Sequence, residues 1–294
     1  MGFHARACGY KMRKGTGETP VPPNYMVDLE YQQEFPPQSH IGGWEGVCWR
    51  AGERLTKNSP GPPPKDLSSS PSLILIGTVH GDPMGYERAL KLLEHFQPDL
   101  ITVEVSRFSL RYRQLQGEKW QRLLNLALED LPIEARGHLA IQRLAAQIAL
   151  PFEVRAARDY SRQYGIPWRP LDLGGPSRRH LPRYARDLLT PENFKTLLTT
   201  EDEPLEDFVA REYHRARLGC RRPTWRLPGL DPETRRRERH QVRRLRHYLA
   251  RYARVAHLGG WEHLAPWRDG DGMWQELADL MPLRLLLDEA ENEK

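Results

Sequence analysis

The sequence predicts an α/β fold: a central, mostly parallel β-sheet flanked by helices, with a large helical insertion after the second strand. Leu73–Ile76 is an apolar run without a polar break, which is typical of a strand buried on both faces. Residues 83–96 then carry apolar side chains at helical spacing, and Asp99–Val105 has the β-branched interior of a second strand. Because strand, helix and strand follow one another so closely, we expect a βαβ unit whose two strands are parallel neighbours.

The predicted insertion is the long helical stretch over residues 109–150, which Pro132 and Gly137 divide into two helices. A further amphipathic helix is predicted over Phe152–Tyr164, with a glycine directly after it as a C-cap. Ile166–Asp172 then has the pattern of a strand that ends in an acid. Its two prolines indicate an edge strand or an irregular one.

The last part of the chain is predicted to contain a helix, a strand and a final helix. Asp231 has the properties of an N-cap, because a proline and a glutamate follow it in the first turn, and the helix runs to about Ala250. Val255–Leu258 follows as a short apolar strand, and Gly272–Leu280 as an amphipathic helix. Residues 173–230 are mostly helical and polar, without a clear order of elements.

The composition is that of a soluble globular chain with room for one large domain or two small ones. It has 294 residues, 39% of them hydrophobic and 28% charged, and a net charge of +5 that allows acidic partners without requiring them. The three cysteines form no CxxC pair, which excludes a thiolate zinc site of that kind and argues against a disulfide framework. No apolar stretch approaches a membrane span, and no signal-peptide core is present, so a cytoplasmic protein is expected.

Three regions are predicted along the chain. Residues 1–71 are rich in proline and glycine and are expected to be extended or poorly ordered, without chemistry of their own. Residues 72–285 form the α/β domain, and residues 286–294 form an acidic tail that is expected to fray from Asp288 onward. The sequence carries no prediction of the oligomeric state.

Side chains suited to catalysis follow each predicted strand. His80 and Asp82 come after the first strand, Glu104 after the second, Asp172 after the third and His263 after the last. In parallel sheets these exits meet at the carboxyl edge, where ligands bind. Two histidines with two or three carboxylates suit a divalent ion such as Mn, Co, Fe or Zn, and equally suit acid–base chemistry without a metal. Each residue alone has an ordinary structural explanation, a hydrogen-bonded histidine or a helix cap, but together they indicate a site.

The stretch Arg211–Arg254 contains fifteen arginines and four acids, a local net charge of +11. Such a density suits phosphate or nucleic acid. The helix over residues 231–254, however, has an apolar stripe, and Glu238 lies on it one turn before the first apolar residue. Glu238 is therefore predicted to face inward, with Arg235 near the same side and Arg239 at its margin, in an internal Glu–Arg network. The stripe consists of Val242, Leu245, Leu249 and Tyr252.

The segments LILIGTVHGD and PDLITVEVS resemble the opening of the TraB/PrgY/GumN family, in which a strand ending in G-T-x-H is followed by a helix and a strand ending in glutamate. Further motifs follow in the family's order across residues 72–285. Pro151–Asp159 resembles the segment in which a glutamate opens an alanine-rich helix, and Gly165–Asp172 the strand that ends in aspartate. Glu238-Arg239 resembles a Glu-Arg pair on a late helix, and Val255–Leu264 the closing strand and glycine-rich turn.

The resemblance implies a core like that of the erythromycin-esterase and ChaN-like superfamily, and an activity like that of the metal-dependent Tiki proteases. Carried over by position, His80, Glu104 and His263 would form the metal or catalytic set, with Glu238 and Arg239 in support.

Residues and resemblance together predict a metal-dependent hydrolase that acts on a peptide or on another amide or ester bond. His80, Glu104 and His263 would hold a divalent ion that lowers the pKa of a bound water, and Glu104 or Asp172 would serve as the base. One alternative is a non-catalytic protein of the same fold that binds a peptide or a small ligand. The other alternative is nucleic-acid binding through the arginine-rich residues 231–254. This segment lacks the interleaved aromatic side chains that are common in nucleic-acid-binding surfaces.

Overall fold

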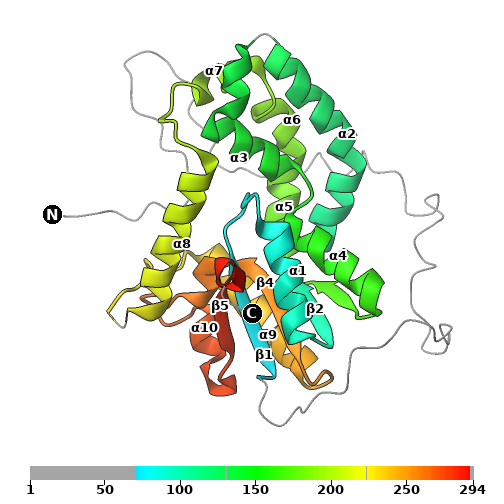
Figure 1. Ribbon diagram of the computed structural model, residues 1–294, viewed down its shortest axis with the longest axis vertical. Coiled ribbons are helices and arrows are strands. Elements are labelled where there is room, and N and C mark those ends of the chain that lie inside the picture. The colour runs from blue at the N-terminus through cyan, green and yellow to red at the C-terminus, as the bar shows by residue number, and fades with distance from the viewer. Residues whose placement is uncertain (1–70, 130, 223, 292–294) are drawn as a thin grey trace. The chain divides into compact units, whose positions relative to one another are not determined.

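The computed structural model describes residues 71–129, 131–222 and 224–291 and has an α/β fold (Figure 1). The apolar run at Leu73 forms the strand β1 (Leu73–Thr78), and all six of its residues are buried. A five-stranded sheet surrounds it in the order β3-β2-β4-β1-β5, and every strand pair is parallel. The other strands are β2 (Leu100–Val103), β3 (Trp168–Pro170), β4 (Val255–Gly260) and β5 (Leu283–Leu286).

The described helices follow the predicted order up to α4 and again at α9, whereas α5 to α8 lie in residues 173–230, for which no order was predicted. The α-helices are α1 (Gly85–Phe96), α2 (Arg107–Glu129), α3 (Leu139–Ile148), α4 (Phe152–Tyr164), α5 (Gly174–His180), α6 (Tyr184–Asp187), α7 (Pro191–Leu197), α8 (Leu205–Arg221), α9 (Pro232–Leu249) and α10 (Met273–Glu276). Within the described residues there are also five short 3₁₀ helices, namely η4 (Ile133–Gly137), η5 (Leu181–Arg183), η6 (Trp261–Leu264), η7 (Ala278–Leu280) and η8 (Leu287–Glu291).

The prediction that β1 and β2 are neighbours is wrong, because β4 lies between them. His257 of β4 is in register with Leu75 of β1 on one side and with Thr102 of β2 on the other. Residues 255–259 of β4 are buried, so this late strand is apolar enough to occupy the centre of the sheet. The crossover through α1 therefore passes over one strand position, which the local sequence does not reveal. The third strand lies at the edge, as its prolines predicted.

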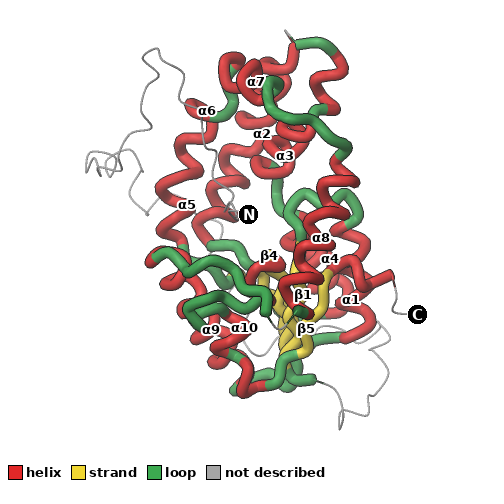
Figure 2. Tube along the Cα trace, turned by 90° about the vertical axis from the view of Figure 1, so that its left-hand side faces the viewer, coloured by secondary structure: helices red, strands yellow, loops and turns green. Residues whose placement is uncertain are grey.

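Helices cover both faces of the sheet. α1 packs against α4 on one face, whereas α9 packs against α10 and contacts β4 on the other. Figure 2 shows the strands between these two layers. The largest hydrophobic cluster joins the layers through the sheet and includes Leu92 of α1, Ala156 of α4, Leu245 of α9 and Leu258 of β4.

The helical insertion has a hydrophobic core of its own. Trp120 and Leu124 of α2 pack with Ile141 of α3 and Phe194 of α7. The segment after β3 thus completes the insertion that α2 and α3 begin after β2. Because α2 begins just after β2 and α5 just after β3, this helical part stands at the carboxyl ends of the strands (Figures 1 and 2).

The end of the chain differs from the prediction in two respects. The helix expected over Gly272–Leu280 is only α10 and η7, and the strand β5 that follows was not predicted. The expectation of fraying from Asp288 is wrong for residues 288–291, because η8 buries Leu287 and Ala290 in the main core. The interpretation of residues 1–70 and of residues 292–294 lies outside the described residues. Within the described part, no helix is both long and apolar enough to cross a membrane.

Candidate functional site

The exits of three neighbouring strands bring Asp172, Glu104 and His263 to one edge of the sheet. Glu104 follows β2 directly, and its Oε2 atom accepts a hydrogen bond from the Gly260 amide at 2.9 Å. His263 lies in η6, which follows β4, and its Nε2 atom is 2.8 Å from the same Oε2 atom of Glu104. The predicted convergence of Glu104 and His263 is therefore a direct ion pair.

Two glycines leave space for the ion pair between Glu104 and His263. A Cβ atom on Gly77 of β1 would lie 2.9 Å from the Cα atom of Trp261, so only glycine lets η6 approach β1 this closely. A Cβ atom on Gly259 would lie 3.2 Å from Oε2 of Glu104. The sequence Gly259-Gly260 thus leaves space for the Glu104 carboxylate and supplies the amide that binds it.

The helix α9 completes the network from one face of the sheet. Glu238 is 1% exposed; its Oε1 atom is 2.5 Å from Nδ1 of His263, and its Oε2 atom accepts a hydrogen bond from the Met273 amide at 2.7 Å. Arg237 donates through Nη2 to Glu104 Oε1 at 2.9 Å, and through Nε and Nη2 to both oxygens of Asp172 at 3.0 and 2.9 Å. We call the set Glu104, Asp172, Arg237, Glu238 and His263 the edge network.

His80 lies beside the edge network and is held by a different carboxylate. Its Nδ1 atom is 3.0 Å from Oε1 of Glu153, which also accepts a hydrogen bond from the Thr78 hydroxyl at 2.8 Å. A methyl group on Gly260 would lie 3.8 Å from His80 Nε2 and 3.6 Å from Glu104 Oε2, so the two groups flank the same small space. The His80 side chain is 68% exposed, whereas that of Glu153 is only 4% exposed.

Neighbouring charges determine the protonation states of Glu104, His263 and His80. Burial would raise the pKa of Glu104, but His263 and Arg237 hold it well below its usual range. Burial would lower the pKa of His263, but Glu104 and Glu238 raise it well above its usual value. For His80, the hydrogen bond and the negative charge of Glu153 raise the pKa to about 9. Both histidines are therefore cations at neutral pH in this arrangement.

One more histidine lies next to the edge network. His257 of β4 is fully buried, its ring centroid is 6.4 Å from that of His263, and its Nδ1 atom is 3.0 Å from the Thr102 hydroxyl. Burial and the nearby charge of His263 lower its pKa to about 3. His257 is therefore a neutral neighbour of the His263 cation.

Two predicted candidates lie elsewhere. Asp82 is buried and accepts hydrogen bonds from Arg88 and from the Tyr213 hydroxyl, both at 2.9 Å, so it ties β1 to α1 and α8. Arg239 was predicted to support the site, but its side chain is 55% exposed and lies 3.5 Å from Asp271. It lies outside the inward face that Arg237 and Glu238 share, because it is rotated by about 100° from Glu238 and about 200° from Arg237 around the helix.

The candidate bases Glu104 and Asp172 have both oxygens engaged. The oxygens of Glu104 accept from Arg237 and Gly260 and face His263, and those of Asp172 bind Arg237. Neither carboxylate has an unpaired oxygen for taking a proton from water in this arrangement.

Sequence reasoning missed the roles of Arg237 and Glu153. Arg237 lies one turn before Gln241, which is fully buried although it is polar, so the inward face of α9 is wider than its apolar stripe indicates. Glu153 lies one turn before the buried Ala156 and Ala157. That spacing places Glu153 on the buried face of α4, and it was the signal in the sequence that could have identified this residue.

The donor set fits a divalent ion in type and in its supporting contacts. Metal-bound histidines commonly direct their second ring nitrogen to a carboxylate. Here the Nδ1 atoms of His80 and His263 face Glu153 and Glu238, which leaves both Nε2 atoms on the side of Glu104. As the side chains stand, no three His, Cys, Asp or Glu residues within the described ranges are arranged around a common metal position.

The charge balance is compatible with an exchange of protons for an ion. With both histidines protonated, three cations, His80, His263 and Arg237, face the four carboxylates of Glu104, Glu153, Asp172 and Glu238. A divalent ion in place of the two imidazolium protons would leave this net charge unchanged, and metal binding generally requires such a release of protons.

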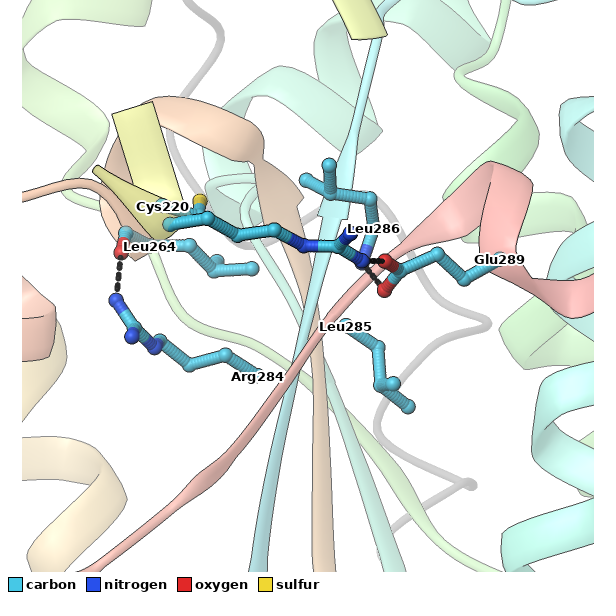
Figure 3. A pocket seen from close by; sticks show the side chains of 7 residues that line it. Cys220, Leu264, Arg284, Leu285, Leu286 and Glu289 are labelled. Atoms are coloured by element: carbon cyan, nitrogen blue, oxygen red, sulfur yellow. Dashed lines mark hydrogen bonds and ion pairs between the residues drawn. The ribbon is translucent and has the colours of Figure 1, made fainter. Parts of the chain in front are cut away.

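A separate cavity of about 380 Å³ opens beside β5 (Figure 3). Arg284 donates to the Leu264 carbonyl at 2.9 Å, and Arg221 pairs with Glu289 across the cavity. None of the edge-network residues lines it.

Comparisons of the chain with protein-family models, with curated proteins and with solved structures found no match.

Proposed function

We propose that this protein is a metal-dependent hydrolase that cleaves a peptide bond, or another amide or ester bond, at the carboxyl edge of its sheet. The observation that supports it best is the pairing of two histidines, His80 and His263, each backed at Nδ1 by a buried carboxylate and each presenting Nε2 toward Glu104. Histidine and carboxylate ligands, with a second carboxylate behind each histidine, are common at catalytic divalent ions.

In the proposed site His80, Glu104 and His263 hold the ion, which would supply a bound water of lowered pKa as the nucleophile. Glu153 and Glu238 hold the two imidazole rings in one orientation and keep the proton on Nδ1. These two carboxylates are positioning residues, because they contact the histidines and not the substrate.

Arg237 is the group suited to the substrate carbonyl. Its Nε and Nη2 atoms are bound by Glu104 and Asp172, whereas no described residue accepts from Nη1, and the side chain is 28% exposed. A fixed guanidinium with a free donor stabilises negative charge that develops on a carbonyl oxygen. Asp172 then acts by orienting Arg237 rather than as a base.

The test combines metal content with activity. The full chain, purified without chelator, is analysed for bound metal and assayed with a mixture of synthetic peptides and nitrophenyl esters in the presence of Mn²⁺ or Co²⁺. We expect His80→Ala to lose both bound metal and hydrolysis, and His214→Ala, which changes an exposed histidine on α8, to retain both. If His80→Ala leaves metal content and hydrolysis unchanged, the proposal is wrong.

The alternative of a non-catalytic ligand-binding protein makes a different forecast in the same experiment. It requires that the wild-type chain holds no metal and hydrolyses nothing when Mn²⁺ or Co²⁺ is supplied. Under that outcome the edge network would be a binding site for a peptide or a small ligand.

A further inference from the structure

Eight of the fifteen arginines between residues 211 and 254 form ion pairs with carboxylates of the described chain. Arg211, Arg217 and Arg221, for example, pair with carboxylates of other segments, and Arg237 belongs to the edge network. The high local charge in the sequence is thus largely used to hold elements together.

Two arginines on the outer face of α9 are exceptions. Arg236 has no hydrogen bond or ion pair to any described residue, and the only side-chain contact of Arg243 is its donation to the Arg239 carbonyl at 3.2 Å. Both side chains belong to exposed residues. Their guanidinium groups are therefore available to a ligand.

These two arginines line a groove of about 390 Å³. Arg236, Arg239 and Arg243 recur at spacings of three and four residues and so lie on one helix face. Arg236 and Arg243 are about 10 Å apart along the helix axis, from a rise of 1.5 Å per residue. The lining consists of Pro232, Arg235, Arg236, Arg239, Arg243 and Glu276.

Acidic residues limit what the groove accepts. Arg235 is held by Asp269 at 2.8 Å and by Asp271 at 2.7 Å, and Arg239 makes only long contacts, at 3.5 Å to Asp271 and 3.7 Å to Glu276. The four guanidinium groups thus exceed the three carboxylates. The carboxylates on the facing side would repel an extended polyanion that continued beyond the groove.

We propose that this groove binds a short chain of linked phosphates, as in tripolyphosphate or a nucleoside triphosphate. Guanidinium groups recognise phosphate oxygens through paired hydrogen bonds, and a row of three suits several linked phosphates better than one. The lining contains no aromatic side chain for base stacking, which disfavours single-stranded nucleic acid. The groove shares no residue with the edge network, so this site is independent of the proposed hydrolase activity.

The test uses calorimetric titration of the full chain with tripolyphosphate, in buffer that contains physiological salt and no divalent ion. We expect the double variant Arg236→Gln/Arg243→Gln to bind at least about tenfold more weakly, since it loses two charge-assisted contacts to phosphate oxygens. Arg251→Gln removes another exposed arginine, just beyond α9, and should leave the affinity unchanged. Glu276→Gln should strengthen binding, because it removes a carboxylate from the lining.

Further titrants identify the source of the phosphate chain. Equal affinities for ATP and tripolyphosphate indicate that only the phosphates are recognised, and tighter binding of ATP indicates a nucleotide; both outcomes support the proposal. No binding of tripolyphosphate, or equal loss in the double variant and in Arg251→Gln, would overturn it. Binding of an oligonucleotide that the double variant loses, without any binding of tripolyphosphate, would overturn it in favour of a nucleic-acid surface.

Discussion

A single methyl group added at Gly77 would disturb the packing at the carboxyl edge of the sheet. In Gly77→Ala the new Cβ atom would lie 2.9 Å from the Cα atom of Trp261, 3.0 Å from Cδ2 of Leu264 and 3.2 Å from Cδ2 of Leu286. The two leucine side chains can rotate, but the Trp261 contact is backbone, so η6 must move. Overpacking of this kind costs about 1–3 kcal/mol, and the backbone contact places Gly77→Ala near 3 kcal/mol.

Urea unfolding of the full chain measures this effect. Gly117→Ala is the matched control, because Gly117 lies inside α2 and a Cβ atom there meets nothing within 4 Å. The same chemical change should stabilise the protein in the control, by about 0.5–1 kcal/mol, since alanine favours a helix over glycine. The two substitutions are thus expected to have opposite signs.

The same substitution also affects the site. Because η6 carries His263, its displacement would lengthen the contact with Glu104. An alanine variant that is as stable as the wild type, with an unchanged dependence on urea, would refute this account of how η6 packs on β1.

Three further predictions concern other parts of the chain. Asp231→Ala should lower the free energy of unfolding by about 1 kcal/mol in urea, because Asp231 accepts hydrogen bonds from the amides of Glu233 and Thr234 at the start of α9; no change would mean that the cap is not formed. Arg237→Gln should lower the free energy of unfolding by up to about 3 kcal/mol, since Glu104 and Asp172 lose the cation that they share. The control Arg236→Gln, on the same helix, should change this free energy little. Equal effects of the two substitutions would contradict the edge network. Burial raises the pKa of Cys220 to about 11 (Figure 3). In a Cys8→Ser/Cys48→Ser variant, the rate at which iodoacetamide labels Cys220 should therefore rise about tenfold per pH unit between pH 8 and 10, because only the thiolate reacts. A labelling rate that is already constant above pH 8.5 would exclude a buried thiol.

Much of the site followed from one property of the sequence, the apolar strands that end in polar residues. Parallel strands bring their carboxyl ends together, so Glu104 and His263 were predicted as neighbours although 159 positions separate them. The inward orientation of Glu238 followed from helical periodicity in the same way.

The remaining features depended on tertiary contacts that periodicity does not record. A buried glutamate was expected to have an arginine partner, but Glu238 contacts His263, and Arg237 serves the other carboxylates. The buried Gln241 shows that the inner face of α9 is wider than its apolar stripe. The apolar stripe alone therefore did not predict that Arg237 faces inward. The short strand β5 was missed because it contains only four residues, one of them an arginine.

The central position of β4 in the sheet has a consequence for co-translational folding. β1 and β2 are made early, yet the strand that joins them begins only at Val255. A nascent chain that ends before this residue holds two apolar strands with no partner between them, and no site. Because domains generally fold as units, this sheet can be completed only after β4 has been synthesised. Chains that terminate before β4 are therefore expected to be ready substrates for chaperones and proteases.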